Sequence, residues 1–160
     1  MTPQQIRDAI AASPALQAHQ AAGRINAIAA ALSAAQPKKM VAGTITTRGA
    51  AAAFPDLTGL GRALSFEVAL SALETWRDAN LTSATLPFKM LARAIKRQLE
   101  SFDARGLDFS DAELRGMLDN LVKAPFGVLS QAQADGFKSL AFTVDDPITD
   151  AQVEDAIKGA

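Results

Sequence analysis

The 160-residue chain has no cysteine and no tyrosine, and it has only one histidine and one tryptophan. The missing cysteine excludes disulfide bonds, thiolate metal sites and thiol nucleophiles. General acid–base catalysis needs positioned titratable groups, and His19 has no acidic residue within one helical turn of it. We therefore expect no enzyme activity, no catalytic residue, no bound metal and no cofactor.

The chain also lacks an excess of charge of either sign. Sixteen basic and 17 acidic residues leave a net charge of −1, so no global electrostatic attraction draws it to nucleic acid or to anionic lipid. No stretch approaches the roughly 18 uncharged apolar residues that a membrane span needs. Polar residues near the start, such as Gln4 and Arg7, interrupt any signal-peptide pattern. We expect no membrane partner, and nucleic acid is not the favoured one.

What the chain does contain is a repeated helix-start pattern. A hydroxyl residue is followed, three positions later, by Gln or Glu. In such a capping box the hydroxyl accepts from a backbone N–H and the Gln or Glu bonds back to the cap. The pattern predicts short helices with defined starts. The four copies are Thr2 to Gln5, Ser110 to Glu113, Ser130 to Gln133 and Thr149 to Gln152.

Apolar spacing and turn residues complete the predicted architecture. Helices are predicted as three pieces in 2–33, two pieces in 47–79 split near Pro55, and one each in 88–100, 110–122, 130–142 and from Thr149 onward. This is an all-α bundle of eight or nine short helices in one domain, residues 1–160. Because aromatics are only 6% of the chain, we expect a thin core of small side chains. In 57–79 the sequence predicts a broad apolar face of Leu60, Leu64, Val68 and Leu73, with Phe66, Leu70 and Trp76 nearby.

One segment differs from the rest. Residues 40–47 form the chain's single cluster of β-branched residues, and the sequence offers no second strand of equal quality. Segment 38–48 is therefore predicted to be a plain linker, an exposed arm over 36–48, or a strand that pairs with another chain. Its candidate partner-binding residues are Lys38, Lys39, Met40, Val41 and Ile45.

A basic helix is the second candidate site. An apolar stripe of Phe88, Leu91, Ile95 and Leu99 predicts the buried face of 88–100. Three interpretations of the opposite face remain open: a solvated surface, a contact with a protein partner, or a contact with nucleic acid phosphates. The residues of this face are Lys89, Arg93, Lys96 and Arg97.

The opening TPQQIRDAIAASPALQAHQAAG with AIAAALS, and the closing GVLSQAQADGFKSLA followed by DDPITDAQVEDAI, resemble small Ala-rich helical proteins encoded in structural gene regions of tailed bacteriophages. The resemblance implies a non-enzymatic virion or assembly component. Its partners would be other phage structural proteins or further copies of itself. It would be found in the virion, or in the host cytoplasm during assembly.

An alternative is a small helical regulatory or nucleic-acid-binding protein. Successive short helices in 2–33 can form a helix-turn-helix, whose second helix reads bases. Here that helix offers only Gln17, His19 and Gln20 for base contacts, and Arg24 is the only basic residue beside it. Salt-sensitive binding to DNA at low ionic strength would favour this alternative.

Overall fold

The computed structural model describes residues 1–159, and over this range it is mostly helical. Nine helices account for 65% of the chain, and one sheet of two short strands accompanies them. The all-α prediction is therefore confirmed. The predicted single domain differs from the structure, in which the chain divides into two compact units. Unit 1 comprises residues 1–39 and 143–160, and unit 2 comprises residues 40–142.

Unit 1 is a small cluster of four helices with an aliphatic core. The helices are α1 (Pro3–Ala12), α2 (Pro14–Ala21), α3 (Ile25–Ala35) and α9 (Asp150–Lys158), and α9 packs against both α1 and α3. Arg7 of α1 donates to the carbonyl of Ala156 at 3.1 Å, near the end of α9. The small-residue core that the composition predicts is not observed in unit 1, because its core consists mainly of Ile, Leu and Val. The buried side chains are Ile6, Ile10, Leu16, Ile28, Ala29, Leu32, Ile148, Val153 and Ala156.

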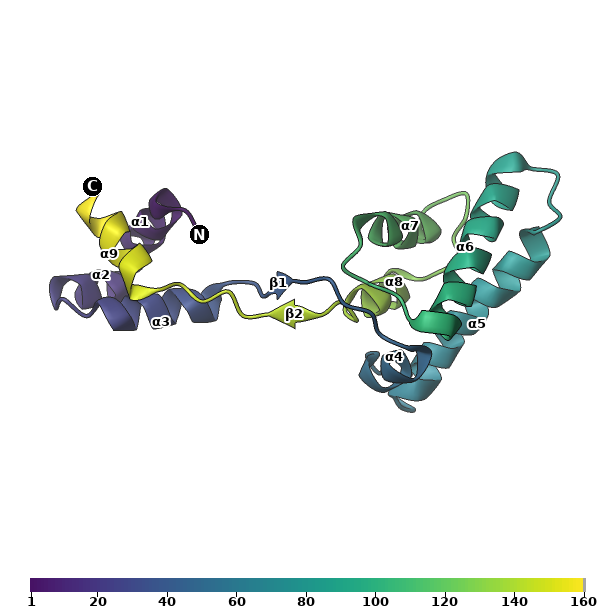
Figure 1. Ribbon diagram of the computed structural model, residues 1–160, viewed down its shortest axis with the longest axis horizontal. Coiled ribbons are helices and arrows are strands. Elements are labelled where there is room, and N and C mark those ends of the chain that lie inside the picture. The colour runs from purple at the N-terminus through teal and green to yellow at the C-terminus, as the bar shows by residue number, and fades with distance from the viewer. Residues whose placement is uncertain (160) are drawn as a thin grey trace. The chain divides into compact units, whose positions relative to one another are not determined.

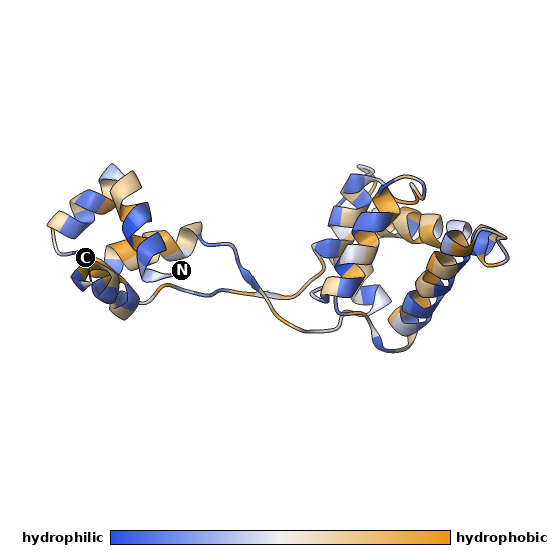
Figure 2. Ribbon diagram, turned by 90° about the horizontal axis from the view of Figure 1, so that it is seen from above, coloured by the Kyte–Doolittle hydropathy of each residue, from blue (hydrophilic) through white to orange (hydrophobic). Residues whose placement is uncertain are grey.

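Unit 2 contains five helices, of which α5 and α6 are the two longest in the described chain. The five are α4 (Thr47–Ala53), α5 (Arg62–Asn80), α6 (Leu86–Arg105), α7 (Ala112–Val122) and α8 (Gln131–Lys138). Figure 1 shows α5 and α6 side by side and antiparallel, joined by a short loop. Each unit 2 helix carries both hydrophobic and hydrophilic residues (Figure 2), so that one side of it can be buried while the other meets solvent.

The core of unit 2 is aromatic, which the low aromatic content did not predict. Phe54 and Phe66 meet edge to face with ring centroids 5.6 Å apart, and Phe66 meets Phe102 at 6.0 Å. Edge-to-face contacts place the positive ring edge against the negative ring face. The buried phenylalanines are Phe54, Phe66, Phe102, Phe109 and Phe137.

Three of the four predicted capping boxes are confirmed. Thr2, Ser130 and Thr149 each accept from the backbone N–H three residues on, and the side-chain oxygen of the paired Gln accepts in return from the cap's own N–H. The box at Ser110 is wrong. Asp108 binds both the N–H and the hydroxyl of Ser110, and Asp111 caps α7 instead by accepting from the N–H of Leu114 at 2.8 Å.

The prediction that segment 38–48 has no partner within the chain is also wrong. Strand β1 (Lys39–Met40) pairs with β2 (Thr143–Val144). Beside them, the N–H of Val41 donates to the carbonyl of Phe142 at 3.0 Å. Ile45 forms an antiparallel bridge with Leu107, through hydrogen bonds of 2.9 and 3.0 Å. The partner strands are only two residues long, which is too short for a recognisable sequence pattern.

Candidate partner-binding surface

The most exposed large apolar side chains of unit 2 lie on α5, on α6 and on the loop before α5. Leu60 is 77% exposed, Leu86 65% and Met90 61%. Leu64 and Val68, on α5, are 44% and 46% exposed, and elsewhere in unit 2 Met40 and Phe142 are each 46% exposed. The sequence assigned Leu60, Leu64 and Val68 to the core face of this helix, and that assignment is wrong. Ordered apolar side chains in solvent are typical of surfaces that bind another molecule.

A hydrogen-bonded loop holds Leu60 in place. The Asp56 carboxylate accepts from the N–H of Gly59 at 2.8 Å and of Gly61 at 3.1 Å, and the buried Ser65 hydroxyl donates to it at 3.2 Å. Burial raises the pKa of Asp56, but the hydrogen bonds from Gly61, Gly59, Ser65 and Thr58 lower it more, so the pKa falls below 3.8. An ionised carboxylate with this many donors rigidifies the loop that presents Leu60.

Helix α5 buries only part of the predicted broad apolar face: Phe66 and Leu73 are buried, whereas Leu64 and Val68 are exposed. Its fully buried residues are Ser65, Phe66 and Ala69, together with Leu73. The exposed side is acidic as well as apolar, because Glu67 and Glu74 lie among its outward residues. Asp78 lies near its end but pairs with Arg77 at 2.8 Å, and this hydrogen bond from Arg77 lowers the pKa of Asp78.

Helix α6 has the predicted faces. Ile95 and Leu99 are buried, while Arg93, Lys96 and Arg97 are exposed. Lys89, which belongs to the same predicted basic face, is half-buried. Pro87 lies in the first turn of the helix. Gly106 follows its last residue and ends it with a φ of +82°. The exposed Leu86 and Met90 extend this basic face toward the start of the helix.

Two shallow hollows flank Arg97. One, of about 460 Å³, is lined by α6 alone, from Met90 to Glu100. The other, of about 420 Å³, lies between α6 and α7 and includes Arg105 on one wall and Glu113 on the other. Lys96 forms an i,i+4 ion pair with Glu100 at 3.8 Å. The surface along α6 is therefore uneven and carries apolar, basic and a few acidic groups together.

The residues proposed in segment 38–48 do not join this surface. In unit 1, Lys38 pairs with Asp145 at 3.4 Å, and both side chains are mostly exposed. Lys39 and Met40 are exposed, and Val41 is half-buried. Ile45 packs against the aromatic core of unit 2. Since backbone groups of Val41 and Ile45 are bonded within the chain, these two residues have a structural role.

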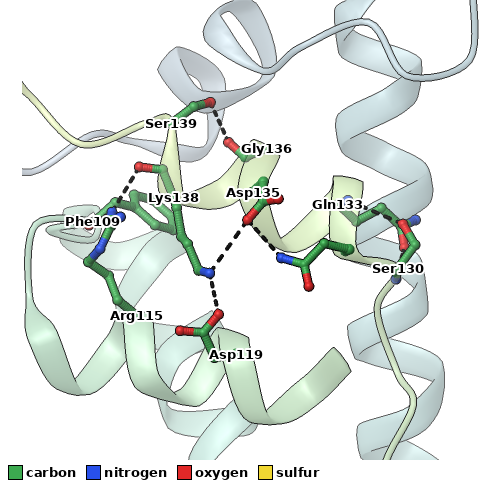
Figure 3. A network of polar contacts seen from close by, with 10 residues as sticks. Phe109, Arg115, Asp119, Ser130, Gln133, Asp135, Gly136, Lys138 and Ser139 are labelled. Carbon is green, nitrogen blue, oxygen red and sulfur yellow. Dashed lines mark hydrogen bonds and ion pairs between the residues drawn. The ribbon is translucent and has the colours of Figure 1, made fainter. Parts of the chain in front are cut away.

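A polar cluster joins α7 to α8 (Figure 3). The Lys138 ammonium, whose side chain is 15% exposed, pairs with Asp119 and with Asp135, the latter at 3.5 Å. The hydrogen bond with Asp119 raises the pKa of Lys138 and lowers that of Asp119. Arg115 donates to the carbonyls of Phe109 and Lys138 at 3.1 and 3.0 Å. The ion pair of Lys138 with Asp119 and the bond of Arg115 to the carbonyl of Lys138 both connect α7 to α8, so the cluster holds these two helices together.

Within residues 1–159, no three His, Asp or Glu side chains come close enough together to hold a metal ion. In the same part of the chain, no helix combines the length and the apolar character that crossing a membrane requires.

Sequence reasoning missed the acidic and apolar outer side of α5. Apolar residues occur on both sides of this helix, so spacing alone allowed either side to face the core. The charge of Glu67, one turn from Leu64, was the signal for solvent exposure, because an unpaired carboxylate is costly to bury. Comparison of the chain with protein-family models, with curated proteins and with solved structures found no match.

Proposed function

We propose that this chain is a non-enzymatic structural or assembly component of a tailed bacteriophage particle, acting through protein–protein contacts. The observation that supports it is the set of ordered, exposed apolar side chains on unit 2, with Leu60, Leu86 and Met90 each more than 60% exposed. Methionine and arginine are enriched at protein interfaces, and both occur on the outer side of α6. The phage assignment follows from the sequence resemblance described above.

The test is the composition of purified particles and of their assembly intermediates. Mass spectrometry should detect the chain in one of these fractions, and deletion of its gene should arrest assembly. A plasmid copy of the wild-type gene should restore particles. A copy with Leu86→Ser and Met90→Ser should restore fewer of them, while Val144→Ser, a change at another exposed apolar residue, serves as the control. Absence from every fraction, together with normal particle yield after deletion, would refute the proposal.

A small nucleic-acid-binding protein remains the alternative, and the exposure of Arg93, Lys96 and Arg97 is the observation that favours it. Titration with duplex and single-stranded DNA at low salt tests it. Binding that weakens steeply with added salt, and that Arg93→Gln with Arg97→Gln abolishes, would support this alternative over assembly.

A further inference from the structure

We propose that the outer sides of α5 and α6 bind a second copy of the chain, with α5 of one copy lying against α6 of the other. This inference rests on the proposed function, because it names one partner through which an assembly protein would act. It is carried by two helix surfaces that are complementary in charge and alike in their exposed apolar residues.

The α5 surface is a stripe of apolar and acidic side chains. Leu64, Glu67, Val68 and Glu74 are all exposed. Glu67 and Val68 follow Leu64 by three and four residues, which places both beside Leu64 on the helix surface. Ser71 lies between Val68 and Glu74 and is also exposed. The small side chain of Ser71 allows another helix to approach closely in the middle of the stripe.

The α6 surface is a stripe of apolar and basic side chains. Leu86, Met90, Arg93 and Arg97 are exposed, and their spacings of four, three and four residues again define one side of a helix. The hollow of about 460 Å³ beside Met90 and Arg97 is open and is lined by α6 alone. These side chains are therefore accessible to a partner helix.

The charges of the two stripes are not used within the chain. In the described residues, Glu67, Glu74, Arg93 and Arg97 take part in no ion pair, although Lys96 and Asp78 nearby do. Within one copy, α5 and α6 meet through their other sides, where Phe66 packs against Phe102. Both stripes therefore face away from the core of unit 2, and opposite charges remain available for a second copy.

A protein partner fits the α6 stripe better than nucleic acid does. Contacts to a phosphate backbone come mostly from basic and polar groups, whereas two of the four residues of this stripe are large and apolar. Glu100 on α6 and Glu113 on the far wall of the second hollow would repel phosphates. An acidic and apolar helix satisfies both kinds of group on α6, and α5 of another copy is such a helix.

The experiment is a charge exchange across the proposed contact, measured by sedimentation velocity on the full chain. One variant carries Arg93→Glu and Arg97→Glu, so that both stripes become acidic. The other carries Glu67→Arg and Glu74→Arg, so that both become basic. The control carries Arg48→Glu and Lys123→Glu, which change the net charge by the same amount as the first variant, at exposed positions outside α5 and α6. Circular dichroism verifies that each variant is folded.

We expect the wild-type chain to associate with a Kd between about 1 µM and 1 mM. Each double reversal should weaken association by at least about tenfold, and the control should leave it unchanged. Mixing the two reversed variants should restore association, because the basic α5 of one then meets the acidic α6 of the other.

Three results would overturn the inference. The first is a wild-type chain that stays monomeric up to about 1 mM, whether or not its α6 residues bind DNA. The second is association that neither reversal weakens. The third is loss of association that mixing does not restore. A monomeric chain that is nevertheless found in particles would remove this inference and leave the proposed assembly function standing.

Discussion

At the level of single residues, Gly136 determines how closely α8 approaches the aromatic core. A β-carbon at this position would lie 2.6 Å from the Phe54 ring and 3.1 Å from Pro55. Neither the buried ring nor the proline can move away easily, because Phe54 is fully enclosed. The close approach of α8 to Phe54 therefore depends on the missing side chain.

Gly136→Ala is expected to destabilise the protein by about 1–3 kcal/mol, the usual cost of an overpacked core. Gly116→Ala is the matched control, since Gly116 is an exposed residue of α7 with no atom within 4 Å of an added β-carbon. The control should stabilise by about 0.5–1 kcal/mol, because alanine loses less backbone freedom in a helix. Urea unfolding measures both changes, and equal effects would contradict the packing argument.

Asp56 links stability to pH. Its pKa in the folded chain lies below 3.8, so its contribution is fully present above the pKa of the unfolded chain and is lost as the pH falls through the folded value. Asp56→Asn should therefore lower the urea midpoint at neutral pH, and its difference from wild type should shrink by about pH 3.

Asp155→Asn removes a carboxylate that is exposed on α9 and serves as the control for this comparison. A difference between wild type and Asp56→Asn that stayed constant across the same pH range would show that the ionised form is not what holds the loop.

At the level of helices and strands, α7 begins at a different cap from the one that the sequence pattern predicts: Asp111 caps it instead of Ser110. Asp111→Ala should cost about 1 kcal/mol, as loss of an N-cap does, because its carboxylate accepts from the N–H of Leu114. Ser110→Ala should cost less, since the Ser110 hydroxyl donates to Asp108 and does not cap the helix. Thermal unfolding of both variants decides between the two caps, and a larger effect at Ser110 would favour the capping box.

The strand contacts of segment 38–48 make a prediction for hydrogen exchange. The amides of Val41 and Ile45 donate to carbonyls within the chain, so they should exchange slowly in a verified monomer. Ala42 and Thr44, which donate no hydrogen bond in residues 1–159, provide the fast-exchanging comparison. Uniformly fast exchange over 41–46 in the monomer would instead support the exposed arm.

The same elements explain what the sequence could predict. The caps at Thr2, Ser130 and Thr149 depend on four consecutive residues and were predicted correctly. The faces of α6 were also correct, because charged residues marked the outside. On α5 the apolar residues of both sides matched a helical spacing, and packing against Phe102 selected Phe66 over Leu64. The role proposed for the basic face of α6 stays a prediction.

At the scale of the whole molecule, unit 2 is a continuous segment inserted between the two halves of unit 1. The pairing that closes unit 2 joins residues about a hundred positions apart in sequence, such as Val41 and Phe142. Patterns within a few residues carry no information about such pairing, which is why one domain was predicted. Residues close in sequence determine where the helices form, whereas contacts between residues far apart in sequence determine the division into two units.

Because unit 2 has its own core and its ends meet at Val41 and Phe142, the fragment 40–142 is expected to fold alone. Its amide NMR spectrum should overlay the corresponding signals of the full chain. The fragment 40–129 is the control, because it lacks α8 and with it Phe137 of the aromatic core. It should give the collapsed spectrum of an unfolded chain. A similar collapse for 40–142 would mean that unit 2 depends on unit 1.

The insertion also fixes the order in which the protein can be completed during translation. Helices α1 to α3 leave the ribosome before unit 2, but the core they share with α9 lacks Val153 and Ala156 until the whole of unit 2 has been synthesised. At about 5–20 residues per second, the nascent helices wait roughly 5 to 20 seconds without α9. Unit 2 has by then all of its own residues, so the first half of unit 1 is made before unit 2 but is completed after it.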